Sequence, residues 1–305
     1  MLTSQDLEFF AVVAAAPSLA GAARALDVTP PAVTQRLKSL EQRLGVRLID
    51  RSSRRLHLTP EGSALAARGA AILEEVEVLA ASLAARRGEI AGPLRVVAPL
   101  GFGRAHVAPV MARMRQDHPA VELDLILSED PAGRIRSDGW DVLVQVGPLA
   151  DSALALRRLA PNRRILCAAP SYLAARGIPS SPGELDRHVC GVIREDRADV
   201  TLWGFTHLGG ETITIRMRPD FASNDGEVIK AWAVAGLGIV QRSEWDVADD
   251  ISAGRLVEIM PDWRLPDADV VALLGPRAGR TARLERLVDM LRRSLTPVPW
   301  RRNGR

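Results

Sequence analysis

The sequence predicts an α/β protein with a helical N-terminal part, a long connecting helix and a larger C-terminal part. Residues 1–59 combine helical spacings of apolar residues with a hairpin pattern, and residues 60–90 contain no helix breaker until about Gly88. Residues 91–296 alternate short strand patterns with helix patterns, and residues 297–305 form a basic tail. Because domains commonly hold about 100 to 200 residues, a chain of 305 residues should form two or three compact units.

The composition is that of an ordinary globular protein. Hydrophobic residues make up 47% of the chain and charged residues 25%, which argues against wholesale disorder. The N-terminus lacks a basic segment followed by an apolar core, and no stretch reaches about 18 uninterrupted apolar residues. We therefore expect a cytoplasmic protein that has no membrane partner.

The two cysteines, Cys167 and Cys190, give no sign of a metal or disulfide site. There is no CxxC pair and no histidine at the spacing of zinc ligands, so we expect neither a structural metal nor a cofactor. Reduced, buried thiols are the default expectation. A redox-sensing pair is the alternative, and it would require exposed thiols of low pKa.

Two short helices open the chain. Leu7, Phe10, Ala11 and Ala14 recur at helical spacing, and this first helix should end near Ala16-Pro17. Ser18 then stands at the expected N-cap of a second helix. The apolar stripe of that helix consists of small residues and leucines, so another helix can approach closely; its members are Leu19, Ala22, Ala23 and Leu26.

A third helix should follow, with a buried side and a polar side. Thr29 can cap it, and Pro30 and Pro31 fit its first turn, where a missing N–H costs little. Its buried seam is Val33, Leu37, Leu40 and Leu44, whereas its outer face carries Thr34, Gln35, Lys38 and Gln42. Arg36 lies on the flank. A generic surface helix would show the same periodicity, although two helices joined by a tight turn are also typical of a helix-turn-helix.

A basic hairpin follows the third helix and favours the second interpretation. Residues 47–51 and 55–58 alternate like two short strands around the tip Ser52-Ser53-Arg54, as in the wing of a winged helix-turn-helix. Between Arg24 and Arg55 there are eight Arg or Lys residues and three acids, a bias that suits a polyanion. The predicted contacts to double-stranded DNA are Ser18, Thr29, Pro30, Pro31, Thr34, Gln35, Arg36, Lys38, Arg51 and Arg54. Gln35 and Arg36 should read base edges, whereas Lys38, Arg51 and Arg54 should contact phosphates or the minor groove.

The connecting helix carries a seam typical of a coiled coil. Thr59 and Pro60 read as its N-cap and first position. The seam has spacings of 4, 3, 4, 3 and 4 residues and consists of Leu65, Gly69, Ile72, Val76, Leu79 and Leu83. We expect dimerisation through Leu65, Ile72, Val76, Leu79 and Leu83, with Gly69 as a weak point. The alternative is that the helix packs on its own domain. A dimer would place two third helices on a two-fold axis, as a palindromic DNA site requires.

The C-terminal part reads as alternating strands and helices. We expect a helix striped by Val107, Val110, Met111 and Met114 and further helices at 225–235 and 280–293. The expected strands are residues 94–98, 121–127, 141–146, 164–168, 189–194, 212–217, 239–241 and 270–274. Open α/β sheets bind ligands at strand ends and domain junctions, so a cleft is expected.

Together, these segments resemble the LysR-type transcriptional regulators. The similarity is dense over residues 1–62, in Ser18-Leu-Ala-Gly-Ala-Ala-Arg-Ala-Leu26, Thr29-Pro-Pro-Ala-Val-Thr-Gln-Arg-Leu37 and Thr59-Pro-Glu-Gly62. In that family Gln is common at the position of Pro30, and a basic residue is frequent where Gln35 stands. The resemblance therefore implies the docking mode on DNA but not the base preference.

In the C-terminal half the resemblance is looser but runs nearly to the end. It rests on Phe102-Gly103-Arg104, Pro170-Ser171-Tyr172-Leu173, Ser223-Asn224-Asp225 and Ala235-Gly-Leu-Gly-Ile239. It implies a domain like a type 2 periplasmic-binding protein, with one subdomain at 92–161 plus 267–296 and another at 162–266. A small-molecule effector would then bind between them.

By the same resemblance, specific residues would line the effector cleft. They are Leu100, Gly101, Phe102, Ser128, Gly147, Arg194, Trp203, Ser223 and Asn224. A helix N-terminus beside Ser223 and Asn224 would favour an anionic effector, and Arg194 could pair with it. Many relatives carry Ser or Thr where this chain has Gly101, so one hydroxyl donor is missing. As alternatives, Trp203 belongs to the core, and Ser223 and Asn224 only cap a helix.

Two other classes of protein fit less well. A periplasmic solute-binding protein would need a signal peptide in place of the first ninety residues. An enzyme would need a recognisable motif, yet the chain contains no GxSxG, P-loop or HExxH. We expect a non-enzymatic regulator that forms dimers and tetramers, with RNA polymerase as a further candidate partner. The tail basic residues Arg301, Arg302 and Arg305 are expected to be disordered, without a role.

Overall fold

A computed structural model describes residues 2–50, 56–86, 89–135, 139–147, 155–194, 199–275 and 281–301. The chain forms two compact units, Met1–Arg87 and Gly88–Arg305. Within the described ranges, no helix is both long and apolar enough to cross a membrane.

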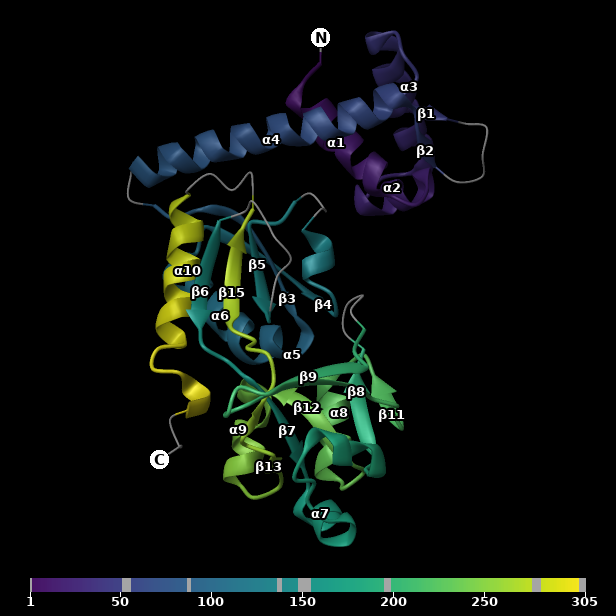
Figure 1. Cartoon of the computed structure of the whole chain (residues 1–305). Helices are drawn as coiled ribbons and strands as arrows, with labels where there is room; N and C mark the ends of the chain where they lie inside the picture. Colours follow the sequence, from purple (N-terminus) through teal and green to yellow (C-terminus); the bar gives the residue numbers. More distant parts are fainter. Residues whose placement is uncertain are drawn as a thin grey trace. The chain divides into compact units, whose positions relative to one another are not determined.

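The N-terminal unit contains three short helices, a hairpin and one long helix (Figure 1). Its core is formed by apolar residues at the spacings that the sequence suggests, including the fully buried Phe10, Leu37 and Leu40. Burial of each such side chain contributes about 1.5–3 kcal/mol. The elements are α1 (Ser4–Ala15), α2 (Leu19–Ala25), α3 (Pro30–Leu44), β1 (Ile49–Asp50), β2 (His57–Leu58) and α4 (Pro60–Arg86).

Side-chain caps begin three of these helices, and one predicted cap is wrong. The Ser18 hydroxyl accepts a hydrogen bond from the Gly21 N–H at 3.1 Å, and the Thr59 hydroxyl accepts one from Gly62 at 2.9 Å. Thr3 caps α1. Thr29 occupies the N-cap position of α3, but its side chain makes no capping bond. The physical reason is local: the next two residues are prolines, which have no N–H, and the N–H of Ala32 donates to the Thr29 carbonyl oxygen at 3.0 Å instead.

The hairpin is present and is tied to α3 by a buried acid. Ile49 pairs with Leu58 and Asp50 pairs with His57 in an antiparallel ladder. The buried Glu41 of α3 accepts hydrogen bonds from the backbone N–H groups of Leu48 at 2.9 Å and Ile49 at 3.4 Å. The hairpin tip, residues 51–55, lies outside the described residues.

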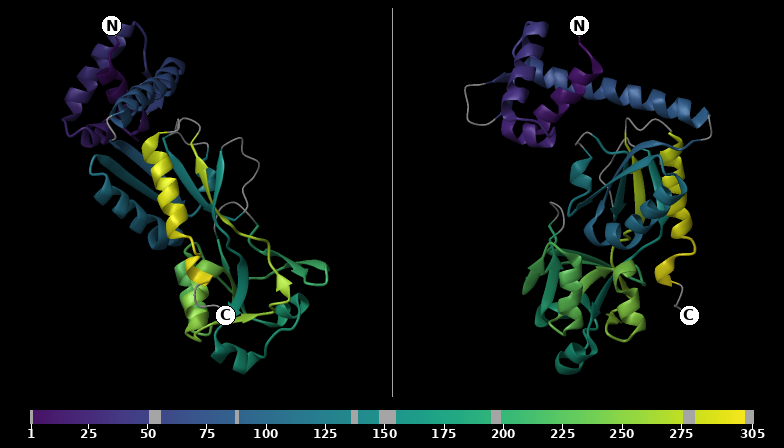
Figure 2. Two further views of the ribbon diagram at one scale, coloured as in Figure 1. Left: turned by 90° about the vertical axis from the view of Figure 1, so that its left-hand side faces the viewer. Right: turned by 180° about the vertical axis from the view of Figure 1, so that it is seen from behind.

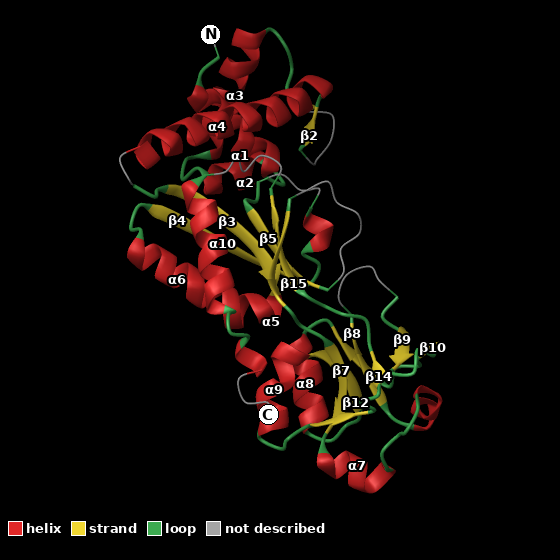
Figure 3. Cartoon of the chain, turned by 60° about the vertical axis from the view of Figure 1, so that its left-hand side comes forward, coloured by secondary structure: helices red, strands yellow, loops and turns green. Residues whose placement is uncertain are grey.

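The C-terminal unit contains two five-stranded sheets, which define two subdomains. Subdomain 1 has strand order β4-β3-β5-β15-β6, with α6 and α10 side by side on one face (Figures 2 and 3). Its strands are β3 (Gly92–Pro99), β4 (Val121–Ser128), β5 (Val142–Val146), β6 (Leu156–Ala160) and β15 (Val270–Leu274). Its helices are α5 (Leu100–Phe102), the π-helical turn η1 (Gly103–Val107), α6 (Ala108–Asp117), the 3-10 turn η2 (Ala132–Arg134) and α10 (Ala282–Ser294).

Subdomain 2 has strand order β11-β8-β12-β7-β13, next to a small antiparallel sheet, β10-β9-β14 (Figure 3). Its strands are β7 (Arg164–Ala168), β8 (Cys190–Ile193), β9 (Leu202–His207), β10 (Thr212–Arg216), β11 (Phe221–Ser223), β12 (Ile239–Ser243), β13 (Val257–Ile259) and β14 (Trp263–Arg264). Its helices are α7 (Pro170–Arg176), η3 (Pro182–Arg187), α8 (Gly226–Val234) and α9 (Glu244–Ser252). The chain enters this subdomain between β6 and β7 and leaves it between β14 and β15.

The C-terminal tail differs from the prediction of disorder. Residues Pro299–Arg301 form a 3-10 turn (η4) that contacts α9. Trp300 packs against the core of subdomain 1, and the Arg301 guanidinium lies 2.7 Å from the Glu244 carboxylate. The expectation of disorder rested on the prolines and the basic residues of the tail. It was wrong for Pro299–Arg301 because the sequence alone does not show which surface Trp300 packs against. Residues 302–305 lie outside the described residues.

Candidate functional site

The outer face of α3 presents polar side chains away from the core. Thr34, Gln35 and Lys38 are exposed, whereas Val33 and Leu37 beside them are buried. The Thr34 hydroxyl donates to the Pro30 carbonyl oxygen at 3.0 Å. Gln35 and Lys38 therefore offer an amide and an ammonium group to a partner on this face.

Arg36 lies on the flank of α3, as expected, but its side chain turns toward α1 rather than toward a base-reading position. Its Nη2 donates to the Gln5 carbonyl oxygen at 2.9 Å, and its guanidinium lies 4.5 Å from the centre of the Phe9 ring. Both partners are at α1. Arg36 thus joins α3 to α1, and we remove it from the residues that should read bases.

Arg43 is also occupied inside the unit. Its guanidinium lies 2.6 Å from the carboxylate of Asp6, a buried residue of α1. The hydrogen bond from Arg43 is the main cause that holds the pKa of Asp6 below its usual value. One of the basic residues counted in the sequence therefore neutralises an internal acid.

The other residues predicted at the DNA surface lie at helix starts or outside the described ranges. Thr29, Pro30 and Pro31 are exposed at the N-terminus of α3, and Ser18 is half-buried as the cap of α2. Arg51 and Arg54 fall on the hairpin tip, which the structure does not describe.

Helix α4 has two unlike halves. Leu65 and Ala66 pack against the core of the N-terminal unit, and at Gly69 an added Cβ would lie 3.1 Å from Leu7. Gly69 is therefore a point of close approach to α1, where the sequence analysis expected a weakened dimer seam. Four predicted seam residues are 48–61% exposed: Ile72, Val76, Leu79 and Leu83.

In the C-terminal unit, side chains from the two subdomains meet at the start of α8. The Arg104 guanidinium of subdomain 1 lies 3.0 Å from Glu227 and 3.8 Å from Asp225 of subdomain 2. Asn224 also donates to the Glu129 carboxylate across the same boundary. Sequence reasoning missed Arg104 and Glu129 because their partners lie 123 and 95 residues further along the chain.

Two residues predicted to bind effector are core residues. Phe102 is 0% exposed and packs edge-on against Trp245, with ring centres 5.3 Å apart. Trp203 is 4% exposed and donates its indole N–H to the Val200 carbonyl oxygen at 3.2 Å. Both side chains are buried among apolar neighbours, so we remove them from the cleft.

The start of α8 is largely satisfied by its own side chains. The Ser223 hydroxyl accepts from the Asp225 N–H at 3.1 Å, and the Asp225 carboxylate accepts from the Glu227 N–H at 2.8 Å. The prediction of available N–H groups for an anion is therefore wrong for these two amides. A helix that begins with Asp225 and Glu227 also already carries negative charge at its positive end.

The remaining predicted cleft residues are Leu100, Gly101, Ser128, Gly147 and Arg194, and among them Gly101 approaches a side chain of subdomain 2. Gly101 is close to Trp245, since an added Cβ would lie 3.0 Å from that ring. Leu100 begins α5, and the Ser128 hydroxyl accepts from the Asp130 N–H at 3.2 Å. Gly147, at a positive φ of 106°, donates its N–H to the Asp269 carbonyl oxygen. Arg194 is exposed.

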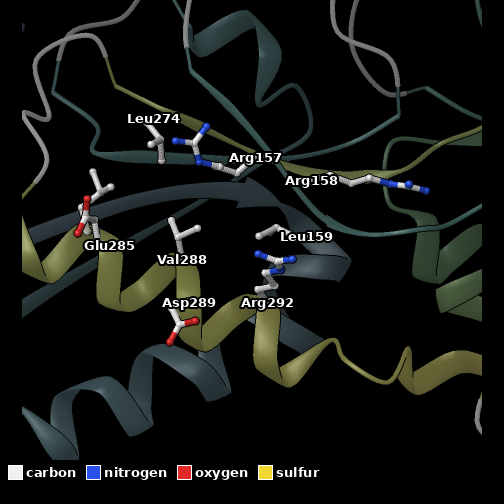
Figure 4. A pocket seen from close by; sticks show the side chains of 9 residues that line it. Arg157, Arg158, Leu159, Leu274, Glu285, Val288, Asp289 and Arg292 are labelled. Atoms are coloured by element: carbon white, nitrogen blue, oxygen red, sulfur yellow. The ribbon is translucent and has the colours of Figure 1, made fainter.

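A groove of about 280 Å³ lies elsewhere on subdomain 1, between β6 and α10 (Figure 4). Its floor is apolar, and its rim carries both signs of charge, with Arg157 and Arg292 against Glu285 and Asp289. This groove is distinct from the predicted cleft. The described residues contain no cluster of His, Cys, Asp or Glu that could hold a metal ion.

Both cysteines are buried in the second subdomain. Burial raises the pKa of each thiol to about 12, far above the ordinary value of 9.0. A redox sensor needs an exposed thiol of low pKa, so these environments argue against that alternative.

Comparisons with known proteins agree with the two-unit architecture. Residues 4–63 match the bacterial regulatory helix-turn-helix of the LysR family, and residues 87–296 match the LysR substrate-binding domain. The chain is 33% identical over 287 residues to the transcriptional regulator DmlR of Escherichia coli K12, covering 94% of this chain and 92% of the relative. It is 31% identical over 259 residues to the regulator CrgA of Neisseria meningitidis serogroup B, covering 85% of each chain.

Solved structures show the same architecture. The structure of CrgA from Neisseria meningitidis aligns with a TM-score of 0.60 at 28% identity, over 97% of this chain and 99% of that one. The full-length Vibrio cholerae activator AphB has the same fold, with a TM-score of 0.60 at 24% identity, over 95% and 98% of the two chains. The fold class predicted from the sequence is thus confirmed. The chain belongs to the LysR family of transcriptional regulators, which joins a DNA-binding helix-turn-helix to an effector-binding C-terminal domain.

Proposed function

We propose that this regulator docks α3 in the major groove of its operator. The observation that carries the proposal is the exposed polar face of α3 above a buried seam. Gln35 would read base edges, whereas Thr34 and Lys38 would contact the phosphate backbone. Ser18, Thr29, Pro30 and Pro31 would approach the backbone at the helix starts, and Arg51 and Arg54 would extend the contact from the wing.

We further propose a homodimer that pairs through the second half of α4, with assembly to a tetramer. Ile72, Val76, Leu79 and Leu83 form an exposed apolar face there, defined as the α4 face. Exposed large apolar residues at heptad spacing are typical of a helix that pairs with a second copy. Leu65 is omitted from this face because it packs within its own unit.

For the effector, we propose a small molecule with an anionic group that binds at the subdomain boundary. Leu100, Gly101, Ser128, Gly147, Arg194 and Asn224 would line its site. Arg194 supplies an exposed guanidinium, and an anion could also compete with Glu227 for Arg104. Effector binding would shift the orientation of the subdomains, and thereby the assembly on DNA and the recruitment of RNA polymerase.

We assign the protein no catalytic activity and place it in the cytoplasm with the DNA. The regulatory names of its relatives support the first assignment.

The test is salt-dependent retention of duplexes that contain the gene's own upstream region. Lys38→Ala should weaken binding to all sequences and reduce the slope of log affinity against log salt by about 1, since one phosphate contact is lost. Arg176→Ala, an exposed cation on α7, is the matched control and should leave the slope unchanged. Wild-type protein with no salt-sensitive retention would contradict the docking proposal.

A further inference from the structure

The two subdomains are joined by more than the two covalent crossings. Leu295, just after α10, is buried in the core of subdomain 1. From there the chain runs to α9 of subdomain 2 and forms η4 beside it (Figure 1). Residues 296–301, defined here as the strap, therefore make a third connection between the subdomains. The strap is covalently joined to subdomain 1 and contacts subdomain 2 only through non-covalent interactions.

Aromatic rings from all three parts meet under the strap. Phe102 and His106 come from subdomain 1, Trp245 from α9 and Trp300 from the strap. The centre of the His106 ring lies 5.7 Å from Trp245 and 5.4 Å from Trp300. Both indole Nε1 atoms are buried and have no hydrogen-bond partner among the described residues. The rings are held by packing rather than by polar contacts, so a relative rotation of the subdomains would separate them.

An ion pair fixes the end of the strap. The Nε of Arg301 donates to both carboxylate oxygens of Glu244 at 3.1 Å, and its Nη2 donates to Oε2 at 2.7 Å. The Glu244 side chain is only 13% exposed. An Arg fork on a carboxylate is directional, so this pair restrains orientation as well as distance.

The strap contacts the same residues at the start of α9 that are hydrogen-bonded to the covalent crossings. The backbone N–H of Trp245 donates to the Asn162 Oδ1 at 3.2 Å, and the Asn162 Nδ2 donates to the Ala268 carbonyl oxygen at 2.8 Å. Asn162 and Ala268 lie on the two crossings, between β6 and β7 and between β14 and β15. Glu244 donates its own N–H to the Arg163 carbonyl oxygen. A displacement of Glu244 or Trp245 is therefore transmitted to both crossings through these hydrogen bonds.

We propose that residues 296–301 are a regulatory strap that restrains the relative movement of the two subdomains and so limits the response to effector. The link to the effector response rests on the proposed function. The restraint itself rests only on contacts within the C-terminal unit. Opening or rotating the subdomains requires the Arg301–Glu244 pair to break and the ring cluster to separate.

The test is amide hydrogen exchange on the full-length protein without effector. Arg301→Ala and Trp300→Ala should each speed exchange about 3- to 10-fold in peptides that cover the start of α9 (240–250) and the crossing between β14 and β15 (264–270), because both segments open more often without the strap. Arg293→Ala is the matched control. Arg293 is an exposed cation of α10 that pairs with Asp289 of the same helix, so its loss should leave the exchange unchanged.

A double-mutant cycle distinguishes a strap from general loosening. Glu244 also lies 3.6 Å from the Arg163 guanidinium, so Glu244→Gln has an effect of its own. If Arg301 acts through Glu244, the combined effect of Arg301→Ala and Glu244→Gln on exchange should be smaller than the sum of the two single effects, each expressed as a free energy. Additive acceleration would overturn the pairing. Unchanged exchange in both Arg301→Ala and Trp300→Ala would overturn the strap.

The same samples separate this proposal from the proposed function. Operator retention by the wild-type protein reports on the N-terminal unit, whereas exchange at the crossings reports on the strap. Loss of one result leaves the other intact.

Discussion

At the scale of single residues, the basic charge of the N-terminal unit divides into two kinds. Arg36 and Arg43 are bound by partners on α1, whereas Lys38 points outward from the same helix. Periodicity assigned a face to each residue, but it could not reveal that a long arginine side chain folds back onto another helix. Such a contact depends on how the helices pack.

Arg36→Ala should therefore lower stability and leave base preference unchanged. The variant loses a hydrogen bond to Gln5 and the contact with the Phe9 ring, for an expected cost of about 1–2 kcal/mol. Gln35→Ala, its neighbour on the exposed face, should have little effect on stability and should change preference among operator sequences. Unfolding curves and binding to a panel of operator variants measure both effects; an altered preference in Arg36→Ala alone would show that our assignment is reversed.

The two cysteines should be inert toward thiol reagents in the folded protein. With a pKa of about 12, about one Cys167 or Cys190 side chain in 10⁴ is a thiolate at pH 8. Because the folded pKa is raised, the neutral thiols favour the folded state up to pH 9.0, and this contribution is lost as pH rises from there to about 12. A disulfide-exchange reagent should detect two thiols only after denaturation. Rapid reaction in native buffer would revive the redox alternative.

At the scale of elements, α3 and the hairpin behave as one piece. Glu41 is buried and holds the backbone of Leu48 and Ile49 at the entry to β1. The spacing of α3 predicted the helix but gave no role to Glu41. An internal acceptor for strand amides can be recognised only once the strand position is known.

Glu41→Ala should destabilise the N-terminal unit by about 1–3 kcal/mol, because buried backbone N–H groups lose their acceptor. The adjacent and exposed Gln42→Ala is the control. Exchange of peptides from α3 in increasing urea measures the difference. Equal midpoints for the two variants would mean that another group accepts from these amides.

Helix α4 combines two readings that the sequence left open. Its first half packs on its own unit through Leu65 and Gly69, and its second half carries the exposed α4 face. A single heptad pattern covers both halves because both use apolar residues at similar spacing. Burial within one chain and pairing between two chains cannot be told apart from that spacing alone.

Val76→Glu should weaken dimerisation by placing a charge on the α4 face. Ala67→Glu introduces the same charge at an exposed position about 180° around the helix, and should leave assembly intact. Sedimentation at micromolar concentration should show monomers only for Val76→Glu, together with weaker operator binding because two half-sites are no longer bridged. Two dimeric variants would place the dimer contact elsewhere.

At the scale of the whole molecule, the sequence predicted the architecture better than the cleft. Strong periodicity and turn residues located β3, β4, β5, β7 and β15, along with α6, α8 and α10. It missed short strands such as β6, whose Arg157 and Arg158 interrupt the apolar alternation. The cleft proved harder because its contacts, such as Arg104 with Glu227, join distant segments. Phe102 and Trp203 were misplaced because an aromatic side chain looks alike in a core and in a binding site.

The position of β15 in the sheet of subdomain 1 has a consequence for synthesis on the ribosome. This strand lies between β5 and β6, yet it is made more than a hundred residues after both. The nascent chain therefore completes the N-terminal unit and subdomain 2 while the first sheet of the C-terminal unit still lacks an interior strand. A ribosome that stalls before Val270 leaves a chain with its DNA-binding end folded and its sensing end open to proteases and chaperones.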